Sequence, residues 1–84
     1  MTDLIQTVES LLEEMIGFQR QKVLKVAREI DPTLTPEDIR NPQDFPTLYH
    51  DFLFNYEDGI LTGYLAVQKA LRVRFNELRS SPQE

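Results

Sequence analysis

The chain has 84 residues, no cysteine, one histidine and a formal net charge of −5. A chain of this size forms one domain with a thin core, and without cysteine it forms neither disulfides nor thiolate metal sites. The acidic balance argues against a general nucleic-acid or anionic-membrane surface, because both need a dominant basic face. Self-association is the remaining way to stabilise so small a core.

Neither a secretion signal nor a membrane-spanning segment is expected. The first 30 residues lack a basic segment followed by an uninterrupted apolar run. No stretch of the chain approaches the roughly 18 consecutive apolar residues that a membrane span needs. We therefore expect a cytoplasmic protein without membrane contact.

Charge alternates along the chain in four blocks. Residues 1–16 carry only acidic charges, residues 17–30 are mainly basic, residues 31–58 are strongly acidic and residues 59–84 are mainly basic. Two helices that each begin acidic and end basic satisfy their own macrodipoles. Packed antiparallel, such helices also face opposite charges along their length, whereas parallel packing would bring like charges together. The pattern favours an antiparallel helical hairpin.

The first predicted helix runs from about residue 3 to residue 30. Thr2 is a suitable N-cap, and Asp3 lies in the first turn, where a carboxylate interacts favourably with the helix dipole. Pro32 ends the helix, because proline disfavours helical backbone at the residue before it. Apolar residues follow one face at helical spacing, namely Ile5, Val8, Leu12, Met15, Ile16, Val23, Val26, Ala27 and Ile30.

The predicted connection, residues 31–44, is rich in proline. Thr35 followed by Pro36, Glu37 and Asp38 is typical of a helix start, with Thr35 as the cap and proline at the first helical position. We expect a single helical turn there, with Leu34 and Ile39 folded over the end of the hairpin. The loop should be packed, because a long unstructured loop is unusual in a small domain.

The second predicted helix runs from about residue 45 to residue 79 without interruption, and residues 80–84 form a frayed polar tail. The single helical domain therefore covers residues 1–79. Steps of three and four residues hold their phase across Gly59, although Gly59 and Gly63 are possible bend points. The apolar stripe consists of Phe45, Tyr49, Phe52, Leu53, Tyr56, Ile60, Tyr64, Val67, Leu71, Phe75 and Leu78.

Both helices carry a second set of apolar residues that one hairpin does not use. On the first helix they recur every seven residues, and on the second they lie roughly opposite the main stripe. The six residues predicted as an interface are Leu4, Leu11, Phe18, Phe54, Leu61 and Leu65. They predict a homodimer that forms a four-helix bundle. The alternative is a monomer of three or four helices, in which a break at Gly17 or Gly59 folds these residues into the core.

The antiparallel register predicts specific charge pairs. With Ile30 level with Pro46, the pairs are Lys25 with Asp51, Arg20 with Glu57, and Asp3 with Arg72 or Arg74. Exposed pairs of this kind contribute only about 0–1 kcal/mol each. We expect them to select the antiparallel orientation rather than to add stability.

No residue pattern predicts a catalytic, metal or cofactor site. His50 and Glu57 lie seven residues apart, about 10 Å along a helix, so they form a solvated face rather than a metal site. The chain has no glycine-rich phosphate loop and no nucleophile with a local activating partner. We therefore expect a non-enzymatic protein without cofactors.

The predicted function is that of a small cytoplasmic protein-interaction module, an adaptor or regulator that self-associates. Its protein partner is not indicated by the sequence. The alternative is a nucleic-acid-associated regulator that uses the basic C-terminal helix, with Lys69, Arg72, Arg74 and Arg79 as phosphate contacts. Nucleic acid is the less favoured partner, because each basic block is followed or faced by an acidic one.

Overall fold

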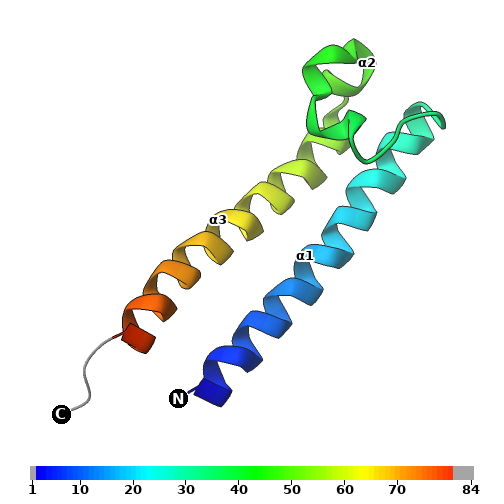
Figure 1. Ribbon diagram of the computed structural model, residues 1–84. Helices are drawn as coiled ribbons and strands as arrows, with labels where there is room; N and C mark the ends of the chain where they lie inside the picture. Colours follow the sequence, from blue (N-terminus) through cyan, green and yellow to red (C-terminus); the bar gives the residue numbers. More distant parts are fainter. Residues whose placement is uncertain (1, 81–84) are drawn as a thin grey trace.

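A computed structural model describes residues 2–80, which form two long antiparallel helices joined by a compact connection at one end (Figure 1). The first helix, α1, spans Thr2–Ile30, and the last, α3, spans Phe52–Ser80. They pack along their length into a rod of 56 × 19 × 19 Å. The predicted all-α antiparallel hairpin is confirmed. The side chain of Thr2, predicted as the N-cap, and residues 81–84 of the predicted tail lie outside the described part of the chain.

The α1 helix buries one narrow stripe against the rest of the molecule. Its buried residues are Ile5, Leu12, Ile16, Gln19, Val23 and Ala27. They follow the steps of three and four residues that keep a seam facing a partner helix. The helix ends at Ile30, and the next residue, Asp31, accepts hydrogen bonds from the backbone N–H and the hydroxyl of Thr33. These bonds lower the pKa of Asp31, because they stabilise its charged form.

The connection contains three short helical pieces. They are the 3-10 helices η1 (Asp38–Arg40) and η2 (Pro42–Asp44), and the four-residue helix α2 (Pro46–Tyr49). Before η1, the backbone N–H of Thr35 donates to Asp38 Oδ2 at 3.0 Å, and the N–H of Asp38 donates to Thr35 Oγ1 at 3.2 Å. The predicted turn with Thr35 as its cap is thus confirmed.

Two leucines of the connection close the end of the hairpin. Leu34 and Leu48 are almost fully buried, and both belong to the core cluster that also contains Val23, Ala27 and Phe54. The Arg28 side chain holds the chain there, because its Nε donates to the carbonyl oxygen of Leu34 at 3.0 Å. The prediction of a packed loop is confirmed, and Ile39 also packs against the core.

The second predicted helix is interrupted, which corrects the expectation of one helix from residue 45 to residue 79. The α2 helix ends at Tyr49, and α3 begins at Phe52. Asp51 causes the new start, because its Oδ1 accepts a hydrogen bond of 2.7 Å from the backbone N–H of Phe54, as an N-cap residue does. The side chain of Asn55 in turn donates to the carbonyl oxygen of Tyr49 at 2.8 Å, which ties the two helices together.

The face of α3 that contacts α1 agrees with the prediction only in part, since Tyr64 and Leu71 of the predicted main stripe do pack against the core. Phe54 and Leu61 are buried against α1, whereas Leu53, Tyr56 and Val67 of the predicted main stripe are at least half exposed. The expectation that Phe54 and Leu61 lie on a free second stripe is therefore wrong. The α3 helix carries two apolar stripes of similar quality, and packing against α1 places the stripe beginning at Phe54 inward.

Neither glycine suspected of breaking a helix does so. Gly17 lies inside α1, and Gly59 and Gly63 lie inside α3. A methyl group added at any of the three positions would meet nothing within 4 Å. The monomer in which a break at Gly17 or Gly59 folds back the second stripe is therefore not the structure observed.

We predict that Gly17→Ala stabilises the protein by about 0.5–1 kcal/mol, because alanine in a helix interior loses less backbone entropy than glycine. Chemical denaturation followed by circular dichroism would measure the change in the free energy of unfolding. Ala27→Gly, at a fully buried position of the same helix, should lower that free energy. A destabilising effect of Gly17→Ala would contradict the open space seen at this position.

We also predict that Asp51→Ala lowers the free energy of unfolding by about 1 kcal/mol, because α3 loses the acceptor for its first backbone N–H groups. Asp51→Asn keeps an acceptor oxygen and should retain most of the stability. Equal losses for the alanine and asparagine variants in the same denaturation assay would count against a capping role.

Candidate functional site

The apolar side chains that the hairpin leaves exposed form stripes along both helices. On α1 they follow steps of four and three residues through Leu4, Val8, Leu11, Met15 and Phe18. Leu4, Leu11 and Phe18 are 61%, 56% and 74% exposed, respectively. These exposed side chains therefore form one regular stripe along the helix rather than isolated surface residues.

The α3 helix carries a matching stripe. Leu53, Tyr56, Val67 and Leu78 are between 43% and 59% exposed, and Ile60 lies half-buried between them. Here too the steps are combinations of three and four residues. The two helices therefore each present one buried apolar stripe and one exposed apolar stripe.

The two exposed stripes lie on the same side of the rod. At 100° per residue, the centre of each exposed stripe is rotated by about 100° from the centre of the buried stripe, in the same sense along both helices. Because α1 and α3 run antiparallel, the same rotation places both stripes on one side. We call this surface the apolar face; its members are Leu4, Leu11, Met15 and Phe18 of α1, and Leu53, Tyr56, Val67 and Leu78 of α3.

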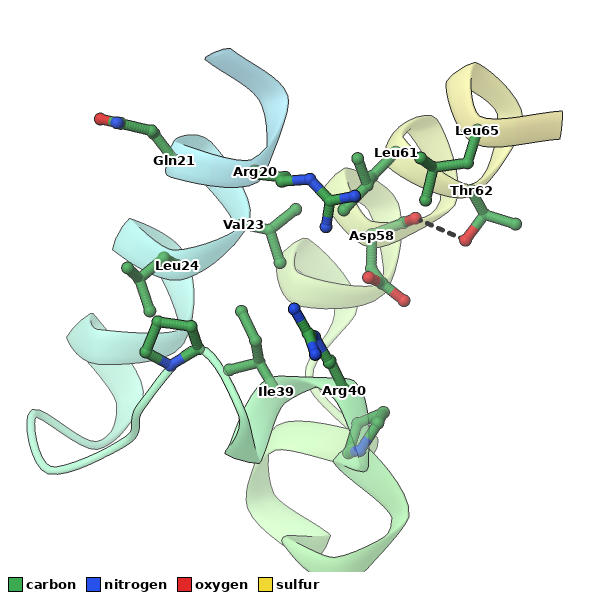
Figure 2. A pocket seen from close by; sticks show the side chains of 12 residues that line it. Arg20, Gln21, Val23, Leu24, Ile39, Arg40, Asp58, Leu61, Thr62 and Leu65 are labelled. Atoms are coloured by element: carbon green, nitrogen blue, oxygen red, sulfur yellow. Dashed lines mark hydrogen bonds between the residues drawn. The ribbon is translucent and has the colours of Figure 1, made fainter. Parts of the chain in front are cut away.

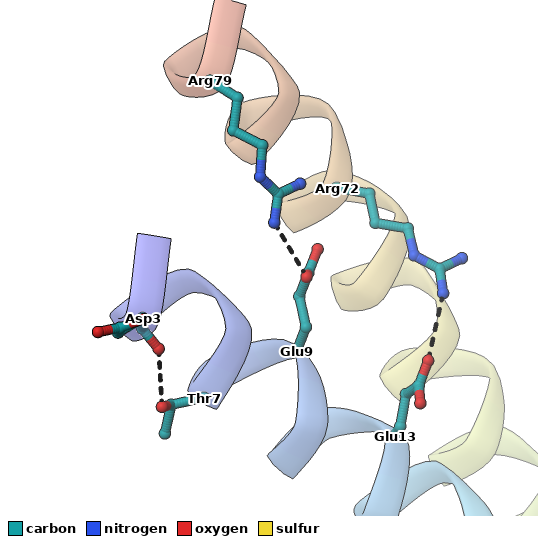
Figure 3. Close-up of polar contacts among 6 residues, drawn as sticks. All are labelled: Asp3, Thr7, Glu9, Glu13, Arg72 and Arg79. Carbon is teal, nitrogen blue, oxygen red and sulfur yellow. Dashed lines mark hydrogen bonds and ion pairs between the residues drawn. The ribbon is translucent and has the colours of Figure 1, made fainter. Parts of the chain in front are cut away.

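Charges are absent from the α1 part of the apolar face and concentrated elsewhere. Between Leu4 and Phe18, the stripe positions of α1 carry no charged residue. Glu9 and Glu13 project to the opposite side, where Arg79 pairs with Glu9 at 3.1 Å and Arg72 pairs with Glu13 at 3.8 Å (Figure 3). Over the half of the rod between Leu4 and Phe18, the α1 stripe is thus apolar and the opposite side is polar, whereas the α3 stripe also contains Arg74, at the helical angle of Tyr56.

The six residues predicted as an interface are not brought together. Leu4, Leu11 and Phe18 share the apolar face and are exposed. Phe54 and Leu61 belong to the core instead, and Leu65 packs partly against that core on the polar side of the rod. The residues of α3 that accompany Leu11 are those of the predicted main stripe. The capping potential of Asp51 was the sequence signal that could have located the start of α3, but it does not distinguish the two stripes.

One polar side chain is buried between the helices. Gln19 is only 5% exposed, and its Nε2 donates to both the carbonyl oxygen and the Oε1 atom of Glu57, each at 2.8 Å. Both hydrogen bonds satisfy an amide that would otherwise destabilise the core. The contact places Gln19 level with Glu57. This agrees with the predicted antiparallel register, in which Ile30 is level with Pro46.

The ion pairs differ from those predicted. Within residues 2–80, no ion pair joins Lys25 to Asp51, Arg20 to Glu57, or Asp3 to an arginine of α3. Asp51 serves as a helix cap and Glu57 accepts from Gln19, so their carboxylates have other partners. Long helical side chains lean toward the N-terminus of their own helix. Arg72 therefore leans toward the connection and meets Glu13 rather than Asp3.

The structure shows no arrangement for metal chemistry around the histidine. His50 is exposed, and its ring meets the ring of Tyr49 edge-on with centroids 5.3 Å apart. Among residues 2–80, no three histidine, aspartate or glutamate side chains lie close enough together to hold a metal ion. None of the helices in this range combines the length and apolar character that crossing a membrane requires.

Comparisons of the chain with models of protein families, with curated proteins and with solved structures find no match. The surface of the molecule is therefore the basis for a functional conclusion, and the apolar face is its most distinctive feature.

Proposed function

We propose that the protein is a self-associating, non-enzymatic interaction module whose two copies pack through their apolar faces into a four-helix bundle. The observation that carries this proposal is the position of both exposed stripes on one side of the rod. A stripe on a single helix would suit a single docking helix, whereas a face built from two antiparallel helices suits a second hairpin.

The size of the face supports a second copy as the occupant. One side of a rod 56 Å long and 19 Å wide presents roughly 1,000 Å². A stable protein–protein interface buries about 800 Å² on each partner, so the face is large enough for one. The same face on two copies is uncharged from Leu4 to Phe18 of α1. Two such faces can meet without burying unpaired charges in that region.

The nucleic-acid alternative finds less support. Arg72 and Arg79 of α3 are paired with Glu13 and Glu9 of α1, and Arg74 is paired with Glu77 of its own helix. Phosphate binding would have to compete with these carboxylates. The adaptor or regulator role remains the proposal, with the dimer as its scaffold.

We predict a solution mass of twice 9.8 kDa at micromolar concentrations, measured by sedimentation or light scattering. Leu11→Asp should weaken the dimer at least tenfold, about 1.4 kcal/mol, because it places a charge at the centre of the apolar face. Val73→Asp is the matched control, since Val73 is also 56% exposed but lies outside this face. Leu61→Asp would not be informative, because Leu61 is part of the core.

A mass of 9.8 kDa over the whole concentration range would refute the proposal. Equal weakening by Leu11→Asp and Val73→Asp would instead show that the dimer uses another surface. Circular dichroism of both variants would establish that each remains helical.

A further inference from the structure

A pocket of about 450 Å³ opens on the polar side of the rod, between α1, α3 and η1 (Figure 2). Its floor is apolar and firmly packed, because Val23 and Leu61 belong to the buried core. Leu24, Ile39 and Leu65 line its walls, and all three are half-buried. The volume is within the range of sites that bind small molecules, about 300–1,000 Å³.

Three charged side chains from three different elements meet at this pocket. Figure 2 shows the Arg20 side chain of α1 extending toward Asp58 of α3, and the Arg40 side chain of η1 extending into the pocket between Ile39 and Asp58. Within residues 2–80, the Arg20 side chain forms no hydrogen bond or ion pair, and the Arg40 side chain pairs only with exposed Glu37, at 3.6 Å. Asp58 also lacks an ion pair in this range, and burial raises its pKa, because its charged form loses solvation. With Glu37 counted beside Arg40, the charges around the pocket balance, and Arg20 is the arginine of the pocket that has no carboxylate partner in the described part of the chain.

We propose that this pocket binds a molecule with an apolar body and a single carboxylate group. The apolar floor and walls would take the body, and the free guanidinium of Arg20 would take the carboxylate, which its planar donor fork fits in a bidentate manner. Asp58 would engage Arg40 and repel a second negative charge on the ligand. This arrangement selects monocarboxylates over dicarboxylates and over neutral or cationic apolar molecules.

The proposal is independent of self-association. Arg20, Leu24, Asp58 and Leu65 lie on the side of the rod opposite the apolar face, as their helical positions show. A ligand in the pocket would not touch a second copy packed on that face. Binding can therefore be measured on the dimer and on the Leu11→Asp variant alike, and the two proposals can fail separately.

Two sources could supply this chemistry, a free carboxylic acid or the carboxyl terminus of a peptide. Octanoate represents the first, and N-acetyl-leucyl-leucine with a free carboxyl terminus represents the second. Octanamide and the C-terminal amide of the same dipeptide are the matched neutral probes. Tighter binding of octanoate would assign the site to free acids, and tighter binding of the dipeptide acid would assign it to peptide termini.

The test is a titration of the full chain with each probe, followed by the methyl NMR signals of Leu24, Ile39 and Leu65. We expect octanoate or the dipeptide acid to shift these signals and to bind at least about fivefold more tightly than its amide. Arg20→Gln should remove this preference while leaving amide binding unchanged. Arg72→Gln is the control, because it removes an arginine of the same side that does not line the pocket.

Three results would overturn the proposal. The first is equal affinity of acids and amides, which would show an apolar cavity without carboxylate recognition. The second is the absence of signal changes at up to about 5 mM of either acid, because a formed site should bind the acid with a Kd below that concentration. The third is that Arg20→Gln and Arg72→Gln weaken acid binding equally, which would show only a general charge effect.

Discussion

The packing of Phe54 and Leu61 against α1 is the constraint on which the rest of the molecule depends, and α3 starts at the cap that the Asp51 side chain provides for the backbone N–H of Phe54. This cap ends the short α2 helix and starts α3 in a new direction. The new start places Leu48 across the end of the hairpin and turns Phe54 into the core, where both are almost fully buried. The direction in which Phe54 faces also determines which way every later residue of α3 faces, since the helix is continuous to Ser80.

The orientation of α3 also determines which apolar residues remain outside. Once Phe54 and Leu61 face α1, Tyr56 and Val67, which lie about 120–160° around the helix from them, cannot face α1 and lie on the outside of the hairpin. The antiparallel arrangement places that flank on the same side as Leu11 of α1. The exposed face is therefore a consequence of the way the core is packed, and two helices with two apolar seams each cannot bury all four seams within one hairpin.

The two long sides of the rod carry different side chains because the packing of the core determines which residues of each helix face which side. Residues rotated in one sense from the core form the apolar face, and those rotated in the other sense include Glu9, Glu13, Arg20 and Asp58. On that second side, ion pairs between the helices occupy the open end, and the pocket with Arg20 lies near the connection. Self-association through the first side would leave the second accessible, so a dimer would present two such pockets.

The sequence by itself determined the all-α class, the antiparallel hairpin and the capped turn at Thr35, because helical periodicity, charge blocks and capping residues act over a few neighbouring positions. It also identified Leu4, Leu11 and Phe18 as residues outside the hairpin core, since α1 has no competing cap within it. Only the tertiary structure decided which stripe of α3 is buried, because both stripes satisfy the same periodicity and the choice depends on packing against α1. The pocket was likewise beyond sequence reasoning: Arg20, Arg40 and Asp58 are far apart in the chain, and only the folding of η1 against both long helices brings them together.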